Sequence, residues 1–81
     1  MEKEIDELTV MIATELRVAR ERMTGTRPTN AELAKAAHVS GMAVGRYMDG
    51  SRAIPVPTFA LICKALGVSP GSILDAALQQ L

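Results

Sequence analysis

The chain has 81 residues and a formal net charge of zero, and hydrophobic residues make up 48% of it although aromatic residues make up only 2%. A chain of this length forms one small domain that buries about 60–65% of its unfolded surface, so we expect a tight helical core or a dimer. With so few aromatic residues, the core must consist of Leu, Ile, Val, Met and Ala, which favours packed helices over sheets.

The residue inventory argues against several classes of protein. The single cysteine, Cys63, excludes an intrachain disulfide and a cysteine-rich metal site, and we expect it in the core rather than as a reactive thiol. No apolar run approaches the roughly 20 residues that span a membrane, and the charged start MEKEIDE differs from a secretory signal. We therefore expect a soluble cytoplasmic protein with no membrane partner. His38 and Cys63 lie in separate predicted elements, without a triad, metal cluster or phosphate loop, so we expect no enzyme activity, metal or cofactor.

The charges are distributed unevenly along the chain. Residues 1–15 contain five acids and one base, for a net charge of −4, whereas residues 16–64 contain eight bases and three acids, for +5. Residues 65–81 add one acid. A basic middle segment suits contact with phosphates, although the same charges are also compatible with a solvated surface.

A long amphipathic helix is predicted from about Lys3 to Met23. Its apolar residues recur at spacings of three and four, namely Ile5, Leu8, Ile12, Leu16, Ala19 and Met23. The acidic N-terminal extension of this helix, residues 1–15, has two interpretations. It lengthens the helix and covers the core, with acids suited to a helix N-terminus, or it docks a second copy or a protein partner.

Residues 29–50, TNAELAKAAHVSGMAVGRYMDG, have the pattern of two short helices joined by a tight turn. Thr29 and Glu32 have the spacing of a capping box for the first helix, and Ser40 is the expected cap of the second, Gly41 to Met48. The predicted inward-facing residues are Leu33, Ala34, Ala37, Val44 and Tyr47. Such a pair buries little by itself and is typical of a helix-turn-helix that presents its second helix to a DNA groove.

Two further helices are predicted after this motif. The fourth spans Val56–Leu66, and the fifth begins with Ser69 as its cap and Pro70 at its first position. The apolar face of the fifth helix is larger than one short terminal helix needs, so we expect residues 68–81 to form a dimer interface. The residues of that face are Ile73, Leu74, Ala77, Leu78 and Leu81.

The stretch from about Leu16 to Leu78 resembles the Cro/lambda-repressor-type helix-turn-helix domain of phage repressors and many bacterial regulators. The matching segments are ELA at 32–34, VS at 39–40, V-x-R-Y at 44–47, DG at 49–50 and KALGVSPGSIL at 64–74. The resemblance implies an all-α, five-helix lambda-repressor-like bundle, here a single domain over residues 1–81 with an extended first helix.

The resemblance also implies which residues contact DNA. The positions that contact bases in the family are Gly41, Met42 and Arg46 here. Arg46 is the main candidate, because a guanidinium bonds guanine in two places; a phosphate contact or a surface charge is the alternative. Gly41 has no side chain, and Met42 offers only apolar contact, for instance to a thymine methyl. The expected phosphate-binding residues are Thr29, Asn30, Lys35, Gly45, Ser51, Arg52 and, in the first loop, Arg27.

Two further residues are expected to have structural roles. Arg20 matches a family arginine that often pairs with a glutamate, whose place Met48 takes here, so Asp49 or Glu32 is the expected substitute. His38 stands in the turn of the motif, where a histidine tolerates the left-handed conformation better than most residues. We expect this backbone role rather than metal binding.

The sequence therefore predicts a sequence-specific double-stranded DNA-binding transcriptional regulator, a phage or prokaryotic repressor that acts as a homodimer on a pseudo-palindrome. The alternative is a protein-interaction module, such as an antitoxin, that uses the same fold. The zero net charge, the glycines of the second motif helix and the surplus apolar faces are compatible with that alternative.

Overall fold

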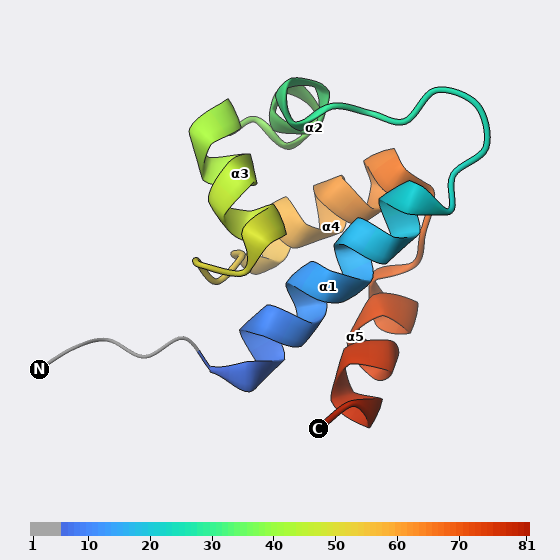
Figure 1. Cartoon of the computed structure of the whole chain (residues 1–81). Coiled ribbons are helices and arrows are strands. Elements are labelled where there is room, and N and C mark those ends of the chain that lie inside the picture. Colours follow the sequence, from blue (N-terminus) through green and yellow to red (C-terminus); the bar gives the residue numbers. More distant parts are fainter. Residues whose placement is uncertain (1–5) are drawn as a thin grey trace, which may run out of the picture.

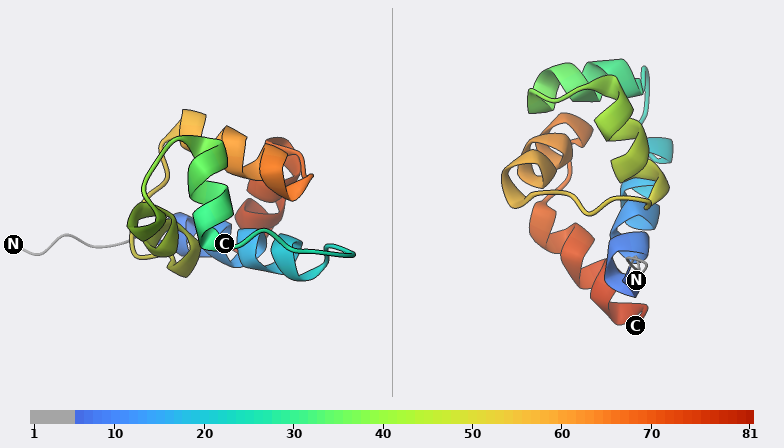
Figure 2. Two further views of the ribbon diagram at one scale, coloured as in Figure 1. Left: turned by 90° about the horizontal axis from the view of Figure 1, so that it is seen from above. Right: turned by 90° about the vertical axis from the view of Figure 1, so that its left-hand side faces the viewer.

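The computed structural model describes residues 6–81, and within that range the chain forms five helices and no strands. The helices are α1 (Glu7–Glu21), α2 (Asn30–Ala37), α3 (Gly41–Asp49), α4 (Val56–Leu66) and α5 (Pro70–Gln79) (Figure 1). The long α1 contacts α3 and α5, while α4 packs against α1, α2 and α5. Two further views place α2 and α3 at one end of the molecule and α5 at the other (Figure 2). The predicted all-α, five-helix bundle is confirmed.

The first helix begins later than its apolar periodicity predicts. Asp6 has extended backbone, and its carboxylate accepts a hydrogen bond from the backbone N–H of Thr9 at 2.8 Å, which makes it the N-cap. This bond also holds the pKa of the Asp6 carboxyl below its usual value. The prediction that the helix starts near Lys3 is therefore wrong: α1 starts at Glu7, and residues 1–5 of the acidic extension lie outside the described residues.

The local signals of the helix-turn-helix are confirmed in the structure. The hydroxyl of Thr29 accepts from the N–H of Glu32 at 3.1 Å, and the Glu32 carboxylate accepts from the N–H of Thr29 at 2.8 Å. His38 ends α2 in the left-handed conformation, with φ of 60°. The Ser40 hydroxyl then caps α3 by accepting from the N–H of Ala43 at 3.0 Å. The capping box fixes the start of α2, and His38 and Ser40 form the turn from α2 to α3.

One hydrophobic core joins all five helices. Its fully buried side chains include Leu16, Leu33, Val44, Ile62 and Cys63. Burial raises the pKa of the Cys63 thiol to about 11, so the thiol is protonated and unreactive at neutral pH, as expected for a core cysteine. The inward-facing residues predicted for α2 and α3 are all buried, and Met48 of α3 joins them.

The fifth helix divides its apolar residues between two environments. Ile73 and Ala77 are buried against the rest of the chain. Leu74, Leu78 and Leu81 are exposed, the last two by 53% and 63%. The expected continuous interface face is therefore corrected: two of its five residues belong to the core of the same chain, and only the three leucines remain available to a second copy.

Two further properties concern the described residues only. No single helix in residues 6–81 is long and apolar enough to cross a membrane, although α4 and α5 together pass that test with a bend of 104° between them. The same residues contain no group of three His, Cys, Asp or Glu side chains arranged to hold a metal ion.

Candidate nucleic-acid interface

The outward face of α3 presents two large side chains. The helix buries Val44, Tyr47 and Met48 in the core, so its other face is turned to solvent. Met42 is 72% exposed, and Arg46 is exposed one turn further along the helix. The Nη2 of Arg46 lies 4.0 Å from the Sδ of Met42. The structure thus brings two of the three predicted base-contacting side chains together, beside Gly41, which is exposed and has no side chain.

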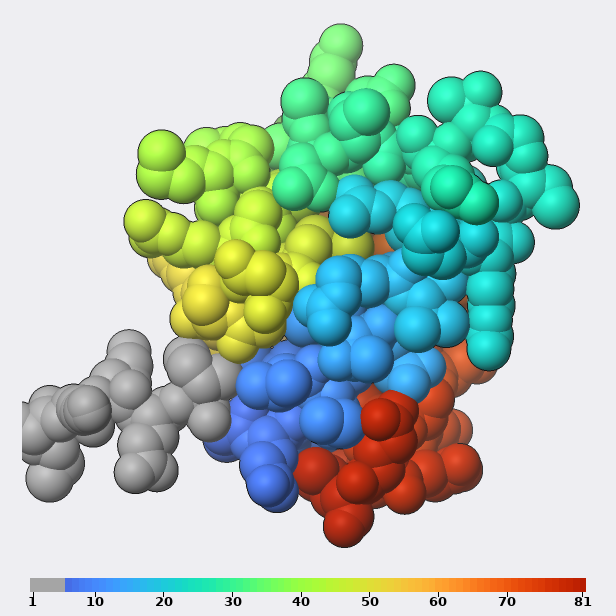
Figure 3. Space-filling view, in the orientation of Figure 1, coloured from blue at the N-terminus to red at the C-terminus, as the bar shows by residue number. Residues whose placement is uncertain are grey.

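A shallow hollow of about 440 Å³ lies beside α3, where α1, α2 and α3 meet. Its lining combines two cations, an amide, a glycine, a methionine and an acid, namely Arg17, Arg20, Asn30, Gly45, Met48 and Asp49. The space-filling view shows α1, α2 and α3 sharing one face, with α5 beyond them (Figure 3). Two of the predicted phosphate-binding residues, Asn30 and Gly45, are therefore neighbours at a basic surface.

Arg20 has a different partner from the one expected. Its Nη1 donates to the Oδ1 of Asn30 at 2.7 Å, so neither Asp49 nor Glu32 takes the place of the family's glutamate. Glu32 is instead engaged in the capping box of α2. Because the amide oxygen of Asn30 accepts from Arg20, its NH₂ group is the part of the side chain that remains to donate to an anion. The neutral partner also leaves the charge of Arg20 uncompensated.

Arg17 connects α1 to the C-terminal end of α3. Its Nη1 donates to the backbone oxygen of Met48 at 2.6 Å. A cation at this place also interacts favourably with the negative end of the helix dipole. Sequence reasoning did not assign Arg17 or Arg20 to the DNA-facing surface. The available signal was their three-residue spacing on the polar side of α1, which puts both on one face.

Gly45 has no structural need to be glycine. Its backbone lies within α3, and a Cβ added there would lie 3.9 Å from the Nδ2 of Asn30, which is an ordinary contact. Glycine inside a helix costs roughly 1 kcal/mol relative to alanine. The absence of a side chain keeps the hollow open along the axis of α3, where a phosphate backbone can approach closely.

The segment after α3 is held close to the helix. The N–H of Ser51 donates to the Oδ1 of Asp49 at 2.9 Å. Hydrogen bonding from the side chain and the backbone of Ser51 lowers the pKa of the Asp49 carboxyl. The guanidinium of Arg52 lies 5.6 Å from the ring centroid of Tyr47, within cation–π range. Ser51 and Arg52 are thus exposed residues positioned by α3, as their predicted phosphate contacts require.

The remaining predicted phosphate contacts are placed less uniformly. The hydroxyl oxygen of Thr29 is used as a cap, and its O–H remains to donate. Lys35 is exposed on α2. Arg27 is turned back to the end of α1, where it donates to the carbonyl of Glu21 at 3.1 Å and pairs with its carboxylate at 3.7 Å. Its loop follows the C-terminal end of α1 (Figure 1), and Arg27 does not line the hollow beside α3.

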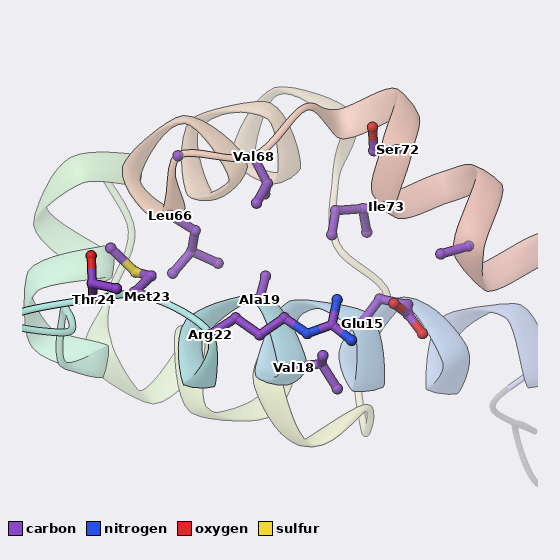
Figure 4. Close-up of a pocket in the computed structure, with 12 residues that line it drawn as sticks. Glu15, Val18, Ala19, Arg22, Met23, Thr24, Leu66, Val68, Ser72 and Ile73 are labelled. Atoms are coloured by element: carbon purple, nitrogen blue, oxygen red, sulfur yellow. The ribbon is translucent and has the colours of Figure 1, made fainter.

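A second and larger hollow lies on the other side of α1. It measures about 540 Å³, between α1 and the turn that joins α4 to α5 (Figure 4). Arg22 and Glu15 border it, and Leu66, Val68 and Ile73 form its apolar part. At 100° per residue, Arg22 and Glu15 project from the face of α1 opposite to that of Arg17 and Arg20. Arg22 therefore marks a cationic position away from α3.

The comparisons with known proteins agree with this geometry. A family model described as a helix-turn-helix domain matches residues 12–76, and the chain belongs to that family. Two crystal structures of the clp gene regulator ClgR from Corynebacterium glutamicum are similar to it. The first has a TM-score of 0.77 and 26% identity, over 95% of this chain and 79% of the ClgR chain. The second has a TM-score of 0.74 and 27% identity, over 91% and 92%.

No curated protein matches the sequence significantly. The family and the ClgR structures together support a DNA-binding transcription regulator. The resemblance to helix-turn-helix regulators predicted from the sequence is thereby confirmed.

Proposed function

We propose that this protein is a sequence-specific double-stranded DNA-binding repressor of bacterial or phage origin that acts in the cytoplasm as a homodimer. The observation that carries the proposal is the pair Met42 and Arg46, exposed together on α3 beside the hollow that Arg17 and Arg20 line. Recognition helices of this motif contact base edges in the major groove, while cations and helix N-termini hold the phosphates. The likeness to ClgR, a gene regulator, supports control of transcription.

In this proposal the residues have two roles. Arg46 bonds the O6 and N7 of a guanine, and Met42 makes an apolar base contact. Asn30 donates its NH₂ group, and Thr29 its O–H, to a phosphate at the N-terminus of α2. Arg20 positions Asn30 through their 2.7 Å hydrogen bond and adds positive charge to the same place. Ser51, Arg52 and Lys35 extend the phosphate contacts along the strand.

Dimerisation is assigned to the exposed leucines of α5. Leu74 lies next to an apolar hollow of about 260 Å³ that Ile12, Val56 and Phe59 also line. Leu78, near the C-terminal end of α5, and Leu81, just after the helix, are exposed. A two-fold pair requires one surface that offers both a projection and a recess, and this surface has both. A dimer places two α3 helices on half-sites about one helical turn apart, and occupation of a promoter by that dimer excludes polymerase.

The same exposed leucines favour a second candidate function. A module that docks another protein through α5, such as an antitoxin, also needs an exposed apolar face. The N-terminal end of α1 lies near this surface, since Thr9 lines the apolar hollow with Leu74. In that case DNA binding through α3 is weak or missing, and the zero net charge of the chain agrees with it.

Selection of duplexes from a random double-stranded library, at two salt concentrations, tests the proposal. The wild-type chain should enrich an inverted repeat with half-site centres about 10 base pairs apart. Binding without a motif, lost steeply as salt rises, indicates a non-specific binder and contradicts sequence-specific repression. No enrichment at low salt contradicts DNA binding altogether and favours the docking module.

Substitution of Arg46 connects the result to α3. Arg46→Ala should weaken binding to the selected duplex by about 5- to 150-fold per half-site, which corresponds to the roughly 1–3 kcal/mol of a bidentate guanine contact. Arg22→Ala is the matched control, because it removes the same charge from the opposite face of α1. It should leave the preferred sequence unchanged. Equal losses in both variants contradict the assignment of base contact to Arg46.

A further inference from the structure

Met42, the exposed methionine of α3, does not pack against the core. Met42 is the second residue of the helix, is 72% exposed, and is the large apolar side chain at the end of α3 that faces away from the core. The residues around it are small: Gly41 precedes it, and a Cβ built on Gly41 would have nothing within 4 Å. Folding therefore does not require an apolar side chain at this position, whereas binding to an apolar group does.

Met42 and Arg46 form a contact with each other before any ligand is present. They stand four residues apart, which puts both side chains on one face of the helix. The Nη2 of Arg46 lies 4.0 Å from the Sδ of Met42. Their Cα atoms are about 6 Å apart along the axis, but their tips meet. Two tips in contact reach neighbouring base pairs, because successive bases are separated by about 3.4 Å.

The chemistry of the two tips is complementary to one kind of base step. A guanidinium has the donors that guanine O6 and N7 accept. A thioether is soft and apolar, and offers no N–H or O–H donor. In the major groove its best partner is a methyl group at C5 of a pyrimidine, which thymine has and cytosine lacks. A 5-methylcytosine has the same methyl group at the same place.

We propose that Met42 and Arg46 act as one unit that recognises a 5-methylpyrimidine beside a guanine, with thymine and 5-methylcytosine accepted alike. The inference rests on the proposed function, and it names the base step that α3 selects. Gly41 and Gly45 contribute no side chain, so on the exposed face of α3 the methyl contact has no competing contact from those positions. Methylation of a cytosine beside guanine then converts a poor half-site into a good one.

The test uses four duplexes that share the inverted repeat recovered by selection and differ at one pyrimidine of each half-site, together with the purine that pairs with it. That pyrimidine is thymine, deoxyuridine, cytosine or 5-methylcytosine, next to the guanine assigned to Arg46. Removal of one buried methyl group weakens binding about fourfold per half-site. A dimer on two half-sites should therefore bind the thymine duplex about 15-fold more tightly than the deoxyuridine duplex, and the 5-methylcytosine duplex more tightly than the cytosine duplex by the same factor.

A substitution separates a protein contact from an effect of the methyl group on DNA shape. Met42→Gln keeps the length of the side chain and removes its apolar tip, so it should bind the thymine and deoxyuridine duplexes with nearly equal affinity, and likewise the cytosine and 5-methylcytosine duplexes. Thr24→Gln is the control that adds the same side chain elsewhere, because Thr24 is exposed and lines the hollow on the other side of α1 from α3. It should keep the 15-fold discrimination.

Three results would overturn the inference in distinguishable ways. Equal affinity of the wild-type chain for the thymine and deoxyuridine duplexes contradicts methyl recognition and leaves the proposed function standing. Discrimination that survives Met42→Gln assigns the effect to DNA shape and removes Met42 from the unit. Failure to bind any of the four duplexes at low salt contradicts the proposed function itself.

Discussion

The helices α3 and α5 have similar buried faces and different exposed faces. Each buries a stripe of apolar side chains in the same core: Val44 and Tyr47 from α3, Ile73 and Ala77 from α5. Each begins with a serine cap. Outward, α3 presents a thioether and a guanidinium next to a basic hollow, whereas α5 presents two leucines, followed by Leu81, next to an apolar one.

This difference separates folding from function within one small domain. The buried stripes and caps account for the shape, and they are of the same kind in both helices. Only the exposed residues differ between the end of the molecule that holds α3 and the end that holds α5. Charge and hydrogen-bond donors suit a polyanion, while exposed leucines suit a protein surface. Substitutions on the buried and the exposed faces of α3 and α5 test whether the two helices share one core and bind different partners.

The largest effects are expected from the shared core. Leu33→Ala, beneath the helix-turn-helix, and Ile73→Ala, beneath α5, should each lower the free energy of unfolding by about 2–5 kcal/mol, because both remove buried methyl groups. Urea titration at fixed protein concentration measures the change. Val56→Ala, at an exposed site, should cost under about 0.5 kcal/mol. If Ile73→Ala lowered the free energy of unfolding by less than about 1 kcal/mol while Leu33→Ala had the full effect, α5 would not be part of the common core.

The exposed leucines of α5 should govern association without governing DNA contact. Leu78→Asp acts on both copies of a two-fold interface, so the loss of about 1.5 kcal/mol per side chain should raise the dimer dissociation constant at least about 100-fold. Sedimentation equilibrium measures this constant. Gln79→Asp introduces the same charge one residue away and should have a smaller effect. A Leu78→Asp chain that stays dimeric would place the interface elsewhere.

The glycines inside the two helices should behave differently towards DNA. Gly45→Ala should stabilise the fold by roughly 1 kcal/mol, because alanine is the better helix former. It should also weaken DNA binding several-fold, because the new methyl group occupies the hollow beside Asn30. Gly71→Ala in α5 is the control: its Cβ has room, 3.5 Å from the Ser69 hydroxyl, and DNA binding should not change. Undiminished binding by Gly45→Ala would remove α3 from close contact with the phosphate backbone.

The smallest effects are expected at the caps. Thr29→Ala removes a capping box with bonds of 3.1 and 2.8 Å and should cost about 1 kcal/mol of unfolding free energy. Ser69→Ala removes a single bond of 3.5 Å and should cost about half as much. Thermal unfolding of both variants gives the order. A larger loss of unfolding free energy in Ser69→Ala than in Thr29→Ala would show that the cap of α5 stabilises the fold more than the capping box of α2.

The sequence predicts most of the fold because its signals are local. The capping box of Thr29 and Glu32, the left-handed His38 and the bounds of α4 depend on residues a few positions apart, and all agree with the structure. The start of α1 was wrong because apolar periodicity continues through Ile5, whereas Asp6 and Thr9 form a cap. A capping aspartate is itself a local signal, and in this chain it decides where α1 begins although the apolar periodicity extends further.

The rest of the candidate site depends on tertiary contacts that spacing does not encode. The partner of Arg20 depends on where the loop after α1 places the first residue of α2, which brings Asn30 within hydrogen-bond reach. The same packing decides that Ile73 and Ala77 face inward while Leu78 faces solvent. Arg27 is turned to Glu21 by its own loop. In each case the residue type was recognised and its environment was not.

The central claim is that α3 and the hollow beside it bind DNA while the leucine face of α5 does not. Titration of the isotopically labelled chain with the selected duplex, followed by amide chemical shifts, tests this claim most directly. The account predicts the largest shifts at Asn30, Met42, Gly45 and Arg46, with Leu78 and Leu81 unchanged at constant dimer concentration. Shifts centred on α5, with α3 unaffected, would contradict it.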